Sequence, residues 1–233
     1  MTDAYERGDV DEASRQGVLA GPTIVEEGLR SPVRSTRLAA IAAAPAVVAS
    51  PELLPALAEV ASGADRRSAI PAVLAARAIA RELAKTDLPD DIGDDDVMTW
   101  RALFDQIAHN QARFIEVRVY ALDTVASLAQ TLSPTSIGFD LASALRDRDP
   151  AFRAAAVQLV PRPTPAALRT PLADAVKDDA DAKVALGAAQ ALCGDHRDPA
   201  LALLGARGIE RIKKLVAGKP ARLTRDATKC LKK

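Results

Sequence analysis

The chain has 233 residues, of which 48% are hydrophobic and 3% aromatic, and its formal net charge is zero. Zero net charge argues against a whole-protein electrostatic field that would steer the chain to nucleic acid or to a membrane surface. No run of about 20 apolar residues is present that would predict a membrane span. The length suits one large domain or one repeat array, and 49 alanines without a stretch of strand periodicity predict an all-α protein.

Residues 1–30 are predicted to form an N-terminal helical cap. A short helix can start at Asp9 or Asp11 and end at Gly21, and a second can start at Pro22, which suits the first position of a helix. The segment is acidic and polar, as expected for the exposed end of a repeat array. It also lacks the basic start and apolar core of a secretory signal, so a cytoplasmic protein is expected.

The next segments are predicted to be helices broken once by an acidic loop. Residues 32–62 indicate a first helical hairpin, and residues 66–84 indicate a long helix that contains Pro71. Residues 86–96 then hold six aspartates with a proline and a glycine. Their spacing does not fit an EF-hand loop, so a solvated loop is expected whose last aspartates cap the next helix. An acidic docking patch for a basic partner is the alternative.

Residues 97–109 are predicted to form a helix with Trp100 and Phe104 on one face. Core packing is the simpler interpretation of this pair. An exposed aromatic contact with a partner is the sharper one, because tryptophan is enriched among binding hot spots.

Residues 145–160 show most clearly a helical pattern that recurs along the chain. Asp149 suits an N-cap, Pro150 the first helical position, and Phe152 begins an apolar stripe. Its simplest form is an apolar residue, a small one and another apolar one at intervals of four. The pattern matches fully at Val117–Ala121–Val125, Phe152–Ala156–Val160, Val184–Ala188–Leu192 and Leu223–Ala227–Leu231, and partly at Val33–Arg37–Ile41 and Ile70–Leu74–Ala78. The copies start 32 to 47 residues apart, which is typical of a helical solenoid.

The sequence Leu-x-Asp-x-Asp-Pro-x-x-Arg at residues 145–153, before an alanine-rich helix, resembles the HEAT repeat family. The apolar–arginine pair recurs at residues 33–34 and 117–118, and the intervening helices at 51–60 and 165–176 resemble each other. The resemblance spans residues 20–233. It implies a single domain over residues 1–233, a right-handed α-α superhelix of about six helical hairpins. It also implies use as a binding scaffold. Several copies depart from the pattern, which leaves their register open: Pro71, Ala185 and Thr224 stand in place of arginine, and Arg37 in place of a small residue.

Two cysteines and two histidines are the candidate metal ligands. Cys193 and Cys230 fall near helix ends in different copies and are expected to be free structural thiols in a reducing cytosol. The spacing of Cys193 and His196 resembles half of a zinc site, but a structural site needs four ligands. No second pair is present, and His109 has only Asp105 at ligand spacing on its helix. We therefore expect neither a metal nor a cofactor.

No nucleophile–base arrangement or glycine-rich phosphate loop is recognisable, so an enzyme is not expected. Alkylpurine DNA glycosylases also use HEAT-like repeats, and Trp100 with Asp105 could stand in for their site. The single tryptophan and the zero net charge argue against this activity.

Residues 207–233 form a basic C-terminal repeat. Ten basic residues face two acidic ones there, so the segment carries +8 and the rest of the chain −8. The sequence predicts a protein–protein interaction scaffold, adaptor or regulatory subunit that binds a partner in a groove lined by the second helices of its hairpins. Nucleic-acid binding through the basic segment is the alternative. The candidate partner-binding residues are Trp100, Arg211, Lys214, Arg222, Arg225 and Lys229.

Overall fold

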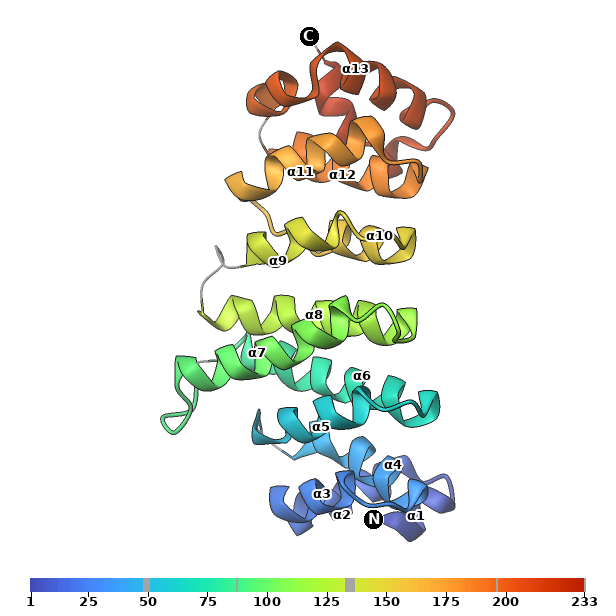
Figure 1. The fold of residues 1–233 in the computed structure, drawn as a ribbon, viewed down its shortest axis with the longest axis vertical. Coiled ribbons are helices and arrows are strands. Elements are labelled where there is room, and N and C mark those ends of the chain that lie inside the picture. Colours follow the sequence, from blue (N-terminus) through green and yellow to red (C-terminus); the bar gives the residue numbers. More distant parts are fainter. Residues whose placement is uncertain (48–50, 87, 133–136, 196, 233) are drawn as a thin grey trace. The chain divides into compact units, whose positions relative to one another are not determined.

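The computed structural model describes residues 1–47, 51–86, 88–132, 137–195 and 197–232 (Figure 1). Every regular element within these ranges is a helix, as predicted. The chain forms two compact units, unit 1 (Met1–Ser133) and unit 2 (Pro134–Lys233). The single domain expected over residues 1–233 stays a prediction. Within the described ranges, no helix combines the length and the apolar character that crossing a membrane requires.

Unit 1 begins with the helical cap and continues with helices that pack in two layers. Its α-helices are α1 (Thr2–Glu6), α2 (Val10–Ala20), α3 (Pro22–Leu29), α4 (Arg34–Ala43), α5 (Leu54–Ala61), α6 (Arg66–Leu83), α7 (Asp94–His109) and α8 (Ile115–Leu132), with 3₁₀ turns η1 (Ala44–Ala46) and η2 (Pro51–Leu53). Helices α3, α5 and α7 contact one another in the odd layer of unit 1, and α4, α6 and α8 do so in its even layer (Figure 1).

The hairpin predicted over residues 32–62 is wrong, because α4 and α5 do not pair. Helix α4 packs on α3 before it, and α5 packs on α6 after it. Four residues, 62–65, connect α5 to α6, whereas ten residues separate α4 from α5. A short connection favours antiparallel packing of neighbouring helices, so the hairpins of unit 1 are α3–α4, α5–α6 and α7–α8.

Unit 2 has the same arrangement. Its elements are α9 (Ile137–Ala144), α10 (Pro150–Gln158), α11 (Ala166–Asp178), α12 (Ala182–Asp195), α13 (Arg197–Val216) and the 3₁₀ segments η3 (Ala221–Leu223) and η4 (Ala227–Leu231). Helices α9, α11 and α13 form its odd layer, and α10, α12 and η4 its even layer. Helix α13 is broken at Gly205, where φ is 58°, as the two glycines in this stretch suggest.

All six copies of the recurring pattern fall in the even layers, on α4, α6, α8, α10, α12 and the η3–η4 segment. The central alanines of the four full matches are completely buried: Ala121, Ala156, Ala188 and Ala227. A small side chain at this position lets the neighbouring helix approach closely. The pattern therefore identifies the second helix of each hairpin.

The helix N-caps predicted from the sequence are present in the structure. The Asp149 carboxylate accepts a hydrogen bond from the Ala151 backbone N–H at 2.8 Å, and Phe152 is completely buried. The acidic stretch is shorter than predicted as a loop, because its last three residues form the first turn of α7. There the Asp96 carboxylate accepts a bond from the Gly93 N–H at 3.0 Å, which is the expected cap.

Candidate functional site

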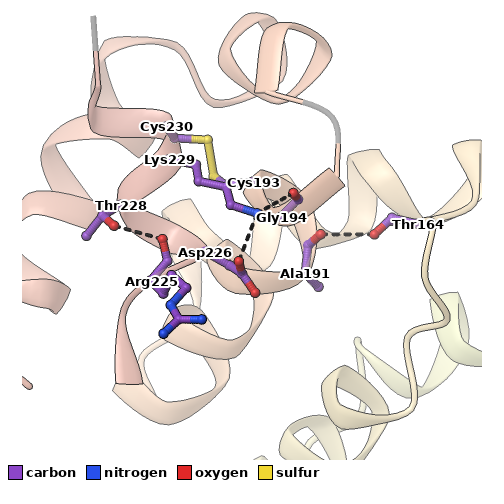
Figure 2. Close-up of a disulfide and its surroundings, with 9 residues drawn as sticks. All are labelled: Thr164, Ala191, Cys193, Gly194, Arg225, Asp226, Thr228, Lys229 and Cys230. Carbon is purple, nitrogen blue, oxygen red and sulfur yellow. Dashed lines mark hydrogen bonds and ion pairs between the residues drawn. A yellow bond between two sulfur atoms is a disulfide. The ribbon is translucent and has the colours of Figure 1, made fainter. Parts of the chain in front are cut away.

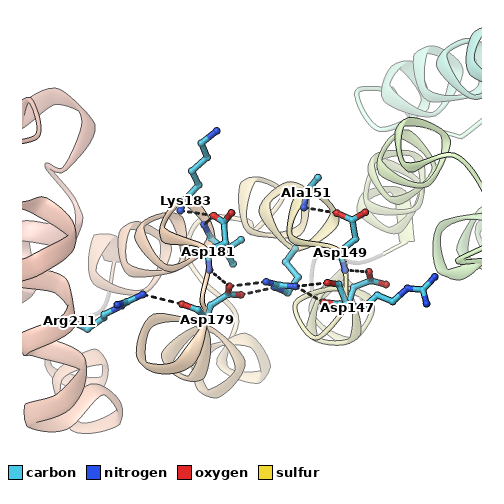
Figure 3. A network of polar contacts seen from close by, with 10 residues as sticks. Asp147, Asp149, Ala151, Asp179, Asp181, Lys183 and Arg211 are labelled. Atoms are coloured by element: carbon cyan, nitrogen blue, oxygen red, sulfur yellow. Dashed lines mark hydrogen bonds and ion pairs between the residues drawn. The ribbon is translucent and has the colours of Figure 1, made fainter.

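Partly buried arginines hold the turns before two even-layer helices, α10 in unit 2 and α4 in unit 1. In unit 2, Arg153 donates to the carbonyls of Asp147 at 2.8 Å and Arg148 at 3.1 Å. Its guanidinium also binds both carboxylate oxygens of Asp179, at 2.7 and 2.8 Å (Figure 3). Such a two-pronged bond is strong and geometrically specific. The hydrogen bonds that Arg153 donates to Asp179 raise the pKa of Arg153 above its usual value.

Arg37 is the counterpart of Arg153 in unit 1. It donates to the carbonyls of Ser31 at 2.7 Å and Pro32 at 3.1 Å, which lie six and five residues before it, as in the Arg153 site. Its guanidinium lies 3.8 Å from the Asp65 carboxylate. The sequence comparison had matched Arg34 with Arg153 and expected a small residue at position 37. That register is wrong by three residues, because α4 begins at Arg34, and Arg37 is the fourth residue of α4 as Arg153 is of α10.

The outward face of the even layer of unit 1 carries an arginine–aromatic stripe. We define it as Arg66, Leu74, Arg77 and Arg81 on α6 with Phe114, Glu116, Tyr120 and Asp123 on or beside α8. The Arg66 guanidinium lies 5.6 Å from the centre of the Phe114 ring. The Arg77 guanidinium lies 5.4 Å from the centre of the Tyr120 ring, within the range of cation–π attraction.

Carboxylates hold these arginines in place. Arg77 and Arg81 bind the same oxygen of Asp123, at 2.6 and 2.8 Å, and Arg66 binds Glu116 at 2.5 Å. Between the arginine positions, Leu74 remains 37% exposed, and Phe114 is exposed to the same extent. The stripe is therefore a preorganised surface with apolar and cationic groups side by side.

Sequence reasoning missed this stripe because it treated Leu74 only as the central residue of a partial match to the recurring pattern. The buried face of α6 instead contains Ala69, Val73, Ala76 and Ala80. The arginines at positions 66, 77 and 81 lie off that face, and their helical spacing was the signal that could have revealed it.

The structure separates the predicted partner-binding residues into different environments. Trp100 is 7% exposed and belongs to the core of unit 1. Arg211 donates to the Asp179 carbonyl at 3.2 Å, and Lys229 donates to the Gly194 carbonyl at 2.8 Å. Lys214, Arg222 and Arg225 are exposed, and no carboxylate of the described residues forms an ion pair with them.

Cys193 and Cys230 form a disulfide, which contradicts the prediction of free thiols (Figure 2). The two cysteines lie 37 residues apart in the sequence, but η4 packs against α12 and brings them together. The prediction of free thiols assumed a reducing cytosol, whereas disulfides persist mainly in oxidising compartments.

Salt bridges reinforce the disulfide-linked segment. Asp226 pairs with Lys229 at 2.9 Å and with Arg162 at 3.0 Å. The hydrogen bond from Lys229, and then that from Arg162, lower the pKa of Asp226 below its usual range. The half-site predicted from Cys193 and His196 includes His196, which lies outside the described residues. Within the described ranges, no group of three or more potential metal ligands occurs.

Comparison with known proteins identifies the fold. No family model and no curated protein matches this sequence. A designed armadillo repeat protein superposes with a TM-score of 0.55 at 16% identity, over 89% of this chain and 97% of that one. A second, in complex with the peptide (KR)4, gives a TM-score of 0.54 at 15% identity, over 89% and 96% of the two chains. An engineered protein gives 0.56 at 15% identity, over 89% and 93%.

These likenesses define a HEAT/armadillo-like helical repeat protein. They confirm the predicted all-α solenoid class and the resemblance that the Asp-Pro-x-x-Arg motif suggested. At this level of identity, they show the fold alone.

Proposed function

We propose that this protein is a non-enzymatic scaffold or adaptor that binds a polypeptide partner on the even layer of unit 1. The observation that carries the proposal is the arginine–aromatic stripe. Arginine and tyrosine are enriched among residues that dominate binding energy. Here Arg77 and Tyr120 contact each other before any partner arrives, and Leu74, on the same helix as Arg77, has an exposed side chain.

Preorganisation lowers the entropic cost of binding, because side chains that are already fixed lose little freedom on contact. Arg77 is fixed between Asp123 and the Tyr120 ring, and Arg66 between Glu116 and the Phe114 ring. A repeat array can also offer an extended surface to an elongated partner. The designed armadillo protein in complex with a peptide supports this use of the fold.

We do not propose a DNA glycosylase activity. Such an activity would require Trp100 to lie in an open groove beside Asp105, where the indole could contact a nucleic acid. With 7% of its surface exposed, Trp100 contributes to the packing of α7 in the core.

Affinity capture from a native lysate tests the proposal. The tagged wild type is compared with Leu74→Glu, which places a carboxylate in the stripe, and with Met98→Glu. Met98 is a matched control, because it is 50% exposed on α7, in the odd layer. We expect the wild type to capture discrete proteins that stay bound after nuclease treatment. Met98→Glu should capture the same proteins, and Leu74→Glu should not. Proteins retained equally by both variants would contradict the proposed surface.

Nucleic-acid binding remains the second candidate, supported by the exposed cations Lys214, Arg222 and Arg225. If each of these three cations engages a phosphate, duplex affinity should fall by roughly 40-fold between 50 and 200 mM salt. A triple charge reversal of these residues should abolish the binding. Absence of binding at low salt would remove this candidate.

A further inference from the structure

A groove of about 510 Å³ lies on the even layer of unit 2, between α10, α12 and the segment before η4. Its apolar surface comes from Val157 on α10, Leu186 and Gly187 on α12, and Leu223 on η3. Leu223 is 51% exposed, whereas the residues at the same position of the other three full matches, Val117, Phe152 and Val184, are completely buried. The groove can therefore take up an apolar side chain from outside.

Gly187 shapes the floor of the groove. A Cβ atom at this position would lie 2.7 Å from the Cγ1 atom of Val157, closer than two carbon atoms can pack. The absence of a side chain lets α10 and α12 approach closely and keeps the space above them open.

The rim of the groove is cationic. Lys183 and Lys219 line it together with the amides of Gln158 and Gln190, and no carboxylate does. Neither lysine forms an ion pair with any described residue. Asp181 accepts bonds from the backbone N–H groups of Lys183 and Val184, at 2.7 and 3.1 Å. The Lys183 side chain extends away from that carboxylate (Figure 3).

The C-terminal wall of the groove is anchored at several points. The Gln190 amide donates to the Leu223 carbonyl, and the disulfide from Cys193 to Cys230 ties the same segment to α12 (Figure 2). The wall is thus positioned before a ligand arrives, which favours binding.

We infer that this groove binds a polypeptide segment in which one apolar side chain is flanked by carboxylates. The apolar side chain would fill the space between Val157, Leu186 and Leu223, and the carboxylates would pair with Lys183 and Lys219. A nucleic-acid strand fits less well, because no aromatic side chain lines the groove to stack a base. The inference rests on the proposed function of polypeptide binding and adds a second site with a defined ligand chemistry.

Fluorescence anisotropy on the full chain tests it with three labelled peptides of equal length. The first has a central leucine with two glutamates on each side, the second replaces the leucine by glycine, and the third replaces the glutamates by lysines. We expect the first peptide to bind at least tenfold more tightly than the other two. Equal affinity for all three, or no binding of the first up to about 1 mM, would overturn the inference.

Variants locate the binding site. Lys183→Glu and Leu223→Asp each change an exposed residue, and each should weaken binding of the first peptide at least tenfold. Lys214→Glu is the matched control, because it reverses an exposed lysine on α13 outside the groove, and it should change affinity less than twofold. If Lys214→Glu weakened binding of the first peptide as much as Lys183→Glu does, the effect would come from overall charge, and this result would overturn the assignment of the site. Failure here leaves the capture experiment with Leu74→Glu unaffected, so the two proposals can fail separately.

Discussion

The guanidinium of Arg153 donates to four acceptors, two carbonyls before α10 and both carboxylate oxygens of Asp179 before α12. The side chains of Arg153 and Asp179 are only 16% and 6% exposed. Removing one member of a buried ion pair leaves the other charge desolvated and unpaired. This residue therefore ties consecutive hairpins of unit 2 together.

We predict that Arg153→Ala lowers the free energy of unfolding by about 3 kcal/mol, the lower end of the cost of breaking a buried pair. Arg34→Ala removes a solvent-exposed pair with Asp65 and should cost less than about 1 kcal/mol. Urea unfolding of both variants measures the difference. Similar small losses for the two would show that the Arg153 contacts are not formed in solution.

Asp226 should make the protein sensitive to acid. Its pKa in the folded state lies below the ordinary value of 3.8 because Lys229 and Arg162 bind the carboxylate. A lowered carboxyl pKa contributes stability that is complete above the pKa of the unfolded state and is lost as the pH falls through the folded-state pKa. The loss should therefore occur below about pH 4.

Thermal unfolding of the wild type and of Asp226→Asn between pH 7 and pH 3 tests this. The variant should be less stable at pH 7 and should lose less stability on acidification. Asp198→Asn, at an exposed position of α13 in the same unit, serves as the control. Parallel pH profiles for the wild type and Asp226→Asn would contradict the role of this carboxylate.

At the scale of single residues, contacts between residues far apart in the sequence could not be predicted. The carboxylate that binds Arg153 is 26 residues away, so local spacing did not identify it. The match of Arg34 with Arg153 failed because a one-dimensional pattern does not show which residue faces the carbonyls of the preceding turn. The same limit concealed the pairing of Cys193 with Cys230.

At the scale of elements, Phe152 tests the register of the recurring helix. It is completely buried on α10, and deletion of a buried phenylalanine side chain costs about 3–5 kcal/mol. We predict a loss of this size for Phe152→Ala by urea unfolding. Met98→Ala, at a half-exposed position, should cost less than about 0.5 kcal/mol. A loss below about 1 kcal/mol for Phe152→Ala would place the residue outside the core.

The disulfide stabilises the end of unit 2. Cross-linking residues 37 apart restricts the unfolded chain, and loss of such a bond typically costs about 2–5 kcal/mol. We predict that Cys193→Ser with Cys230→Ser lowers unfolding stability within this range and that a reducing agent affects only the wild type. Mass spectrometry should find the native wild type lighter by two hydrogens than its reduced form. Two titratable thiols in the natively purified protein would contradict the bond.

Helix type and helix position were predictable from the sequence, whereas helix partners were not. The recurring apolar–small–apolar pattern marks every even-layer element, because burial against two neighbours demands it. In α6 the pattern matched only partly, with Leu74 at the position of the small residue, and the buried face is built mainly from alanines. Many small residues make several faces of an alanine-rich helix look equally suitable for packing.

At the scale of the whole chain, counting charges overestimated the unpaired positive charge of residues 207–233. Residues 207–233 carry +8, but part of that charge is used within unit 2. Arg207 pairs with Asp178, and Lys229 pairs with Asp226. The surface that we propose for a partner lies instead on α6 and α8. The helical spacing of its α6 arginines indicated that they share a face, but the sequence did not show which aromatic and acidic side chains they contact.

Site-specific photocrosslinking tests the central claim most directly. A photoreactive amino acid is placed at position 74, on the even layer of unit 1, and separately at position 98, on the odd layer, and both proteins are irradiated in native lysate with and without nuclease. The proposed scaffold function predicts discrete protein adducts from position 74 that resist nuclease and that position 98 does not form. Adducts from position 98 alone, or adducts at position 74 that disappear on nuclease treatment, would contradict it.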